Sequence, residues 1–178
     1  MIHAYDESYL DLAMRNLGEA FDYASNACGI VMDSFAEMFV TGGYAEQFQK
    51  GNPKIIAGLS GTELAMEIIT KSGMDITFPG QQTAYDFSPE YWCGWVLAYY
   101  QWKSSRSFKD ILDIFPMEEI YKLYGTLHEA SEDKFVDVAE AIREMKQPVT
   151  KLQRQRKRAG YSQKQLSEKS GVNLRTLQ

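Results

Sequence analysis

The charge of this chain divides sharply at Pro148, and this division constrains the fold more than any other feature. From Pro148 to Gln178 the chain holds eight Lys or Arg residues against one acidic residue, a net charge of +7. Residues 1–147 hold 11 basic and 23 acidic residues, a net charge of −12. We therefore expect two parts, an acidic body (residues 1–147) and a basic segment (residues 148–178). Such asymmetry is typical of nucleic-acid-binding proteins, but a solvated basic helix has the same composition.

The basic segment carries start and end signals of short helices. Gly160 follows residues at helical spacing and is suited to end a helix, because glycine adopts the left-handed conformation needed there. Ser162 and Gln165 have the spacing of a capping box. Tyr161 and Leu166 flank them at the positions of a hydrophobic staple. These signals predict that one helix ends at Gly160 and that the next begins directly after Ser162.

Two short helices follow from these signals. The first is expected from about Gln163 to Lys169, before the turn at Ser170-Gly171. Asn173 is a suitable N-cap for the second helix, whose first residues end the sequence. Two short helices joined by a tight turn that contains glycine form a helix-turn-helix, and its second helix enters the DNA major groove.

A resemblance to a known family covers about the last thirty residues. The run RKRAGYSQKQLSEKSGV, residues 156–172, resembles the Xre-type helix-turn-helix of phage repressors and of many bacterial regulators and antitoxins. The resemblance implies that the helix beginning at Asn173 reads DNA bases through Leu174, Arg175 and Thr176. It also implies phosphate contacts, which position the protein without reading sequence, from Lys157, Arg158, Gln163, Lys164 and Asn173.

The family's domain contains five helices, and this sequence ends within the one expected to read DNA. Arg156 in this family pairs with a Glu late in that helix, a position beyond Gln178. About thirty residues with few large apolar groups do not form a core of their own. We therefore expect the chain to be part of a longer regulator and to bind DNA poorly alone; the alternative is that the segment docks on the body.

The acidic body is predicted to be an all-α bundle of about six or seven helices, followed by the incomplete helix-turn-helix. Apolar residues alternate at spacings of four and three from Leu10 to Cys28, which predicts one long helix. A second helix is expected from Ile30 to Phe39. Caps and prolines predict that further helices start near Ser60, Ser88, Ser107, Pro116 and Ser131.

An aromatic stripe marks the helix predicted at residues 89–105. Helical spacing puts four large rings on one face, Trp92, Trp95, Tyr99 and Trp102. The helix is apolar nearly all round, which favours a central, buried position. Buried Trp and Tyr still need hydrogen-bond partners and are favoured at protein interfaces, so a partner surface is the alternative interpretation. Base stacking is disfavoured because the body is acidic.

Signals for catalysis, metal binding or membrane insertion are weak. The longest apolar run has nine residues, against the about 20 that a membrane span needs. Cys28 and Cys93 lie in apolar helical patterns and are expected to be free thiols. His128 lacks the second His of a zinc-protease helix and suits a helix C-terminus. We expect a cytoplasmic protein with no cofactor, no metal, no membrane contact and no catalytic residues.

Three hypotheses about function remain. The first is a DNA-binding transcriptional regulator whose body dimerises or senses a partner. The arrangement resembles antitoxin-like autorepressors, so the expected partners are double-stranded DNA, a second copy of the chain and a protein such as a cognate toxin. The second is a protein-interaction module that does not bind DNA. The third is an unrecognised enzyme in the acidic body.

Overall fold

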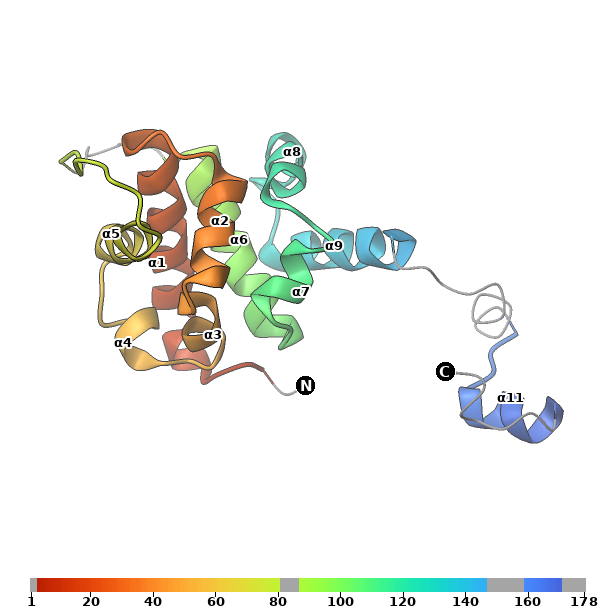
Figure 1. The fold of residues 1–178 in the computed structure, drawn as a ribbon. Helices are drawn as coiled ribbons and strands as arrows, with labels where there is room; N and C mark the ends of the chain where they lie inside the picture. The colour runs from red at the N-terminus through yellow and green to blue at the C-terminus, as the bar shows by residue number, and fades with distance from the viewer. Residues whose placement is uncertain (1–2, 81–86, 147–158, 171–178) are drawn as a thin grey trace. The chain divides into compact units, whose positions relative to one another are not determined.

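The computed structural model describes residues 3–80, 87–146 and 159–170, and these contain helices and loops but no strand (Figure 1). The prediction of an all-α fold is therefore confirmed. The chain divides into two compact units, Met1–Glu140 and Ala141–Gln178. None of the described helices is long and apolar enough to cross a membrane.

The first unit contains a succession of helices that differ greatly in length. In chain order they are the 3₁₀ turn η1 (Glu7–Tyr9), α1 (Leu10–Asp22), the π-helical turn η2 (Tyr23–Ala27), α2 (Met32–Thr41), α3 (Tyr44–Gln49), α4 (Pro53–Ile56), α5 (Gly61–Lys71), α6 (Pro89–Ser104), α7 (Phe108–Leu112), α8 (Met117–Leu127) and α9 (Glu132–Lys146), whose end belongs to the second unit.

The number of helices is larger than the six or seven predicted. Nine α-helices lie in residues 3–80 and 87–146, because α3 and α4 were not predicted. These two helices have only six and four residues, too few to show a helical period. The predicted N-caps Ser60, Ser88 and Ser107 are all observed.

The predicted long first helix is continuous in the structure but changes its winding. α1 runs directly into η2, where the amide of Cys28 donates to the carbonyl of Tyr23 at 3.0 Å, an i to i+5 bond. The apolar side chains of the predicted seam are buried from Leu10 to Ala24, with Leu17 and Phe21 at 0% exposure, whereas Cys28 at its end is half-buried. Periodicity therefore found the buried face of this helix as far as Ala24.

Helix α1 lies against both α5 and α6. It approaches them at two glycines, Gly61 and Gly94. A Cβ at Gly94 would lie 2.4 Å from the carbonyl oxygen of Leu17, and one at Gly61 would lie 2.5 Å from that of Asn16. Neither position has room for a methyl group. The side chain of Asn16 adds a polar tie, because its amide donates to the carbonyls of Ile56 (3.0 Å) and Leu59 (2.7 Å).

Three phenylalanines fill the space between α2, α3 and α7. Phe39, Phe48 and Phe108 are fully buried and contact one another edge to face, with ring centroids 5.0–5.9 Å apart. Edge-to-face contacts of this kind stabilise beyond the area they bury. The short helices α3 and α7 are thus held by tertiary packing, which explains why local sequence signals did not reveal α3.

Candidate functional site

The aromatic stripe of α6 lies mostly under α8 and α9. Trp92 packs edge to face on Tyr124 and Phe135, both with ring centroids at 5.6 Å. Trp95 donates from Nε1 to the carboxylate of Glu132 at 2.9 Å. Trp92 and Trp95 stay half-buried. Only Trp102 of the stripe belongs to the buried core, and Tyr99, like Trp92 and Trp95, is half-buried.

The remaining two aromatic residues of the stripe are also hydrogen-bonded within the body. The hydroxyl of Tyr99 donates to the carboxylate of Asp133 at 2.6 Å, and Trp102 donates from Nε1 to the carbonyl of Tyr5 at 2.9 Å. Trp102 is only 4% exposed. A partner contact by these four residues stays a prediction, and the described contacts leave Trp102 little surface for it.

A pocket of about 670 Å³ opens beside the stripe, where α1, α6, α8 and α9 supply its walls. This volume lies within the range of small-molecule sites in proteins. Its residues come from far apart in the sequence, from Arg15 of α1 to Phe135 of α9. Sequence analysis singled out Trp92, Trp95 and His128 among its residues but gave no signal that joined them to Arg15, because only the fold brings them together.

Aromatic rings make up most of the pocket wall. Phe87, Tyr91 and Trp95 form a stack along α6, with ring centroids 4.4 Å and 6.0 Å apart. Tyr124 and His128 of α8 form a second stacked pair, with centroids 4.6 Å apart. Phe87 is 75% exposed, unusual for a phenylalanine.

Few polar groups face this aromatic wall. The exposed Arg15 makes no hydrogen bond or ion pair with any residue in the described ranges. Burial, and next the charge of Glu19, raise the pKa of Tyr91 to about 12, while Arg15 acts in the opposite direction. The Tyr91 hydroxyl therefore stays protonated at neutral pH and is a potential donor. Glu132 accepts the bond from Trp95 with one carboxylate oxygen.

His128 ends α8, as the sequence predicted. Its Nδ1 lies 2.9 Å from the carbonyl oxygen of Tyr124, and its Nε2 lies 3.7 Å from the carboxylate of Glu129. Within the part of the chain that the structure describes, no hydroxyl or thiol hydrogen-bonds to either His ring in the manner of an activated nucleophile. That part also contains no group of three His, Cys, Asp or Glu residues able to hold a metal.

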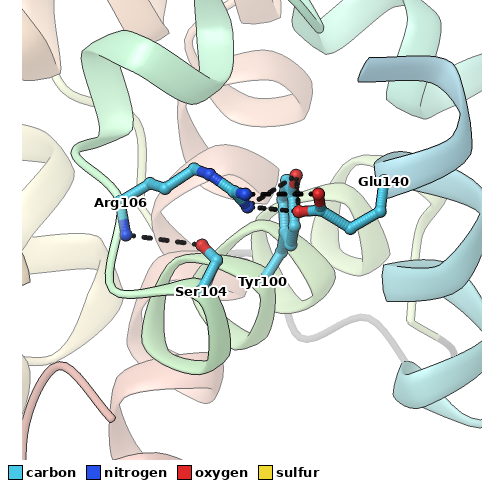
Figure 2. A network of polar contacts seen from close by, with 4 residues as sticks. All are labelled: Tyr100, Ser104, Arg106 and Glu140. Carbon is cyan, nitrogen blue, oxygen red and sulfur yellow. Dashed lines mark hydrogen bonds and ion pairs between the residues drawn. The ribbon is translucent and has the colours of Figure 1, made fainter. Parts of the chain in front are cut away.

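A polar cluster ties α9 to the end of α6. The Arg106 guanidinium pairs with both carboxylate oxygens of Glu140, and the Tyr100 hydroxyl donates to the same carboxylate at 2.6 Å (Figure 2). Ser105, with a positive φ of 54°, ends α6 and turns the chain toward Arg106. Figure 2 also shows the Arg106 amide bonded to the Ser104 hydroxyl. The cluster fixes the first part of α9 beside the pocket.

The second unit contains α11 (Gln163–Ser170), which begins and ends close to where the sequence predicted. The amide of Ser162 donates to the side-chain oxygen of Gln165 at 2.8 Å, and the amide of Gln165 donates to the Ser162 hydroxyl at 3.1 Å. The predicted capping box is therefore present. Gly160 has a φ of +71°, the left-handed conformation expected after a helix.

Most of the predicted DNA contacts fall outside the described residues. These are Lys157, Arg158, Asn173, Leu174, Arg175 and Thr176. Lys164 is exposed in the first turn of α11, and Gln163 is the first residue of that helix. Lys169 donates to the hydroxyl of Tyr161 at 2.7 Å and lies over its ring at 4.5 Å, which holds α11 to the turn before it.

Both cysteines are free, as predicted. Burial raises the pKa of the Cys93 thiol strongly and that of the half-buried Cys28 thiol to a smaller degree. A thiol with a raised pKa is poorly ionised at neutral pH and is a weak nucleophile. Neither cysteine therefore has the features of a reactive site.

No protein-family model, no curated protein and no solved structure matches this chain.

Proposed function

We propose that this chain belongs to a DNA-binding transcriptional regulator of the helix-turn-helix type, in which the basic segment contacts DNA. The observation that carries the proposal is the capping box of Ser162 and Gln165 at the start of α11. It occurs at the position where the sequence resembles the Xre-type motif. The surrounding segment has a net charge of +7 within an otherwise acidic chain, and a basic footprint of this kind supports DNA binding.

Two sets of residues have different tasks in this proposal. Lys157, Arg158, Gln163, Lys164 and Asn173 contact phosphates, which gives affinity for any sequence and a steep dependence on salt. Leu174, Arg175 and Thr176 enter the major groove, where the Arg175 guanidinium bonds the edge of a guanine.

The acidic body serves dimerisation or partner binding in the same proposal. Two copies of a helix-turn-helix protein commonly read paired half-sites, so a homodimer is the expected assembly. A cognate toxin is the partner that the resemblance to antitoxin-like proteins suggests, and such a pair would act in the cytoplasm. The net charge of −12 on residues 1–147 fits a body that contacts protein, because it repels the phosphate backbone.

Fluorescence anisotropy with the full-length protein tests this proposal. The duplex upstream of its own gene should bind more tightly than a random duplex, with an affinity that falls steeply with salt. Arg175→Ala should cost about 1–3 kcal/mol on the specific duplex and relax base preference. Lys164→Gln should weaken both duplexes equally and lower the salt slope by about one.

The body offers the matched control for these variants. Lys54 is exposed on α4, so Lys54→Gln removes the same charge from the first unit and should leave DNA affinity unchanged. Equal affinity for specific and random duplexes at every salt concentration would contradict specific regulation.

A protein-interaction role for the body is the second candidate. The observation that favours it is the exposed ring of Phe87 beside the half-buried Trp92 and Trp95, since exposed aromatic residues are common in binding surfaces. Purification of the complete protein with its neighbouring gene product, in nuclease-treated extract, tests this role. Failure to recover the neighbouring product would contradict this role.

A further inference from the structure

We propose that the pocket between α1, α6, α8 and α9 binds a small planar aromatic monocarboxylate, with its ring against the aromatic wall and its carboxylate on Arg15. This proposal does not rest on DNA binding by the basic segment, because every residue that it uses lies in the first unit.

The shape of the wall favours a flat aromatic ligand. The rings of Phe87, Tyr91 and Trp95 are stacked face to face, with interplanar angles of 24° between Phe87 and Tyr91 and 28° between Tyr91 and Trp95. The side of this stack therefore consists of ring edges. Ring edges carry partial positive charge and attract the face of another ring in a T-shaped contact. A flat ring against this wall would therefore repeat the edge-to-face geometry that Trp92 already adopts with Tyr124.

The polar groups favour an anion on that ring. Arg15 lines the pocket without an ion pair or hydrogen bond in the described residues, and guanidinium groups bind carboxylates in bidentate fashion. The protonated hydroxyl of Tyr91 is a second donor that bonds to no described residue. Glu132, the carboxylate of the lining, is half-buried and already accepts the Trp95 N–H, which lowers its capacity to hold a cation.

The charge of the body limits how negative the ligand can be. Residues 1–147 have a net charge of −12, and each further negative charge on a ligand adds repulsion that a single guanidinium does not offset. A monocarboxylate balances Arg15 one to one. Dicarboxylates and phosphate esters are disfavoured on the same ground.

Isothermal titration calorimetry with three compounds of one skeleton tests the proposal: indole-3-acetate, uncharged indole and the amine tryptamine. We expect saturable binding of one equivalent of indole-3-acetate, with weaker binding of indole and weakest binding of tryptamine. Arg15→Gln should raise the Kd of indole-3-acetate at least tenfold and change that of indole less than twofold. Because Arg15 is exposed, the variant should keep its fold, which circular dichroism checks.

Two further variants test whether the compounds bind in this pocket. Lys54→Gln removes an exposed cation distant in sequence from the pocket and should leave all three affinities unchanged. Ala130→Trp places a large ring at an exposed lining position and should weaken indole-3-acetate and indole together. The proposal is overturned if tryptamine binds more tightly than indole-3-acetate, if Arg15→Gln binds indole-3-acetate as well as the wild type does, or if millimolar indole-3-acetate gives no saturable heat.

Discussion

The body and the basic segment are stabilised in opposite ways. In the first unit, helices bury side chains completely against one another, as Phe39, Phe48 and Phe108 do. In the second unit, no described side chain of residues 141–146 or 159–170 is buried, and α11 is held by its capping box and by Lys169 on Tyr161. Within the described residues, tertiary packing holds the helices of the body, whereas the contacts seen at α11 are local. We therefore expect substitutions in the body to change the free energy of unfolding more than substitutions at α11 do.

The largest loss of stability should come from a substitution at Gly94, where α1 and α6 approach most closely. In Gly94→Ala the new methyl group meets the Leu17 carbonyl oxygen, so the helices must separate, at an expected cost of about 3 kcal/mol. Urea unfolding followed by circular dichroism measures this loss.

Gly125 offers the matched control within the same unit. It lies inside α8, and no described atom lies within 4 Å of the position that a Cβ would take there. Gly125→Ala should therefore stabilise the helix by about 0.5–1 kcal/mol. Equal effects at the two glycines would refute the close approach of α1 and α6.

A smaller loss of stability is expected when the polar cluster in Figure 2 is disrupted. Glu140→Ala removes the acceptor of Arg106 and of the Tyr100 hydroxyl, which should cost about 1–2 kcal/mol. A double-mutant cycle with Arg106→Ala measures the coupling, and additive losses would show that the pair contributes no mutual stabilisation.

The dependence of the body's stability on pH should include a contribution from Asp133. The bonds from Lys103, and next from Tyr99, lower the pKa of this carboxyl below its usual 3.8. A group whose pKa is lowered by folding stabilises the protein above its unfolded pKa, and this stabilisation is lost as pH falls through the folded pKa. Asp133→Asn should therefore lower the urea midpoint at pH 7, and the difference from the wild type should shrink below about pH 4. A difference that stays constant down to about pH 2 would contradict this assignment.

The smallest effect on global stability should come from Ser162, although its local effect is clear. Ser162→Ala removes one half of the capping box and should destabilise α11 by about 1 kcal/mol, while the unfolding midpoint of the body stays unchanged. Amide hydrogen exchange across residues 163–170 measures the local loss. Ser162→Asn should restore protection because Asn is also a good N-cap. A shift of the body's midpoint in Ser162→Ala would show that the two regions are energetically coupled.

Sequence analysis predicted the parts of the fold that local signals determine. The caps Ser60, Ser88 and Ser162 each lie where the pattern put them, because a capping box (Ser60, Ser162) or a proline after the cap (Ser88) needs only residues close in sequence. It missed α3 and α4, whose few residues are held by distant phenylalanines and by the cap at Asn52.

The candidate site was predictable in the same partial way. Helical spacing put Trp92 and Trp95 on one face, and the structure has both beside the pocket. Arg15 and Tyr124 carried no signal, because they join that face only when α1 and α8 pack on α6. The pairing of Arg106 with Glu140 spans 34 residues and likewise depends on tertiary structure.

The two glycines that face α1 bear on how relatives of this protein could be found. Gly61 and Gly94 approach the carbonyls of two adjacent residues, Asn16 and Leu17. These two glycines therefore mark the positions where α5 and α6 cross the same stretch of α1. Exposed positions on these helices are free to diverge, whereas a larger residue at either crossing would force the helices apart. A search profile that fixes small residues at these two positions, with an apolar seam like that of α1 before them, should therefore detect distant homologues that overall sequence identity leaves unrecognised.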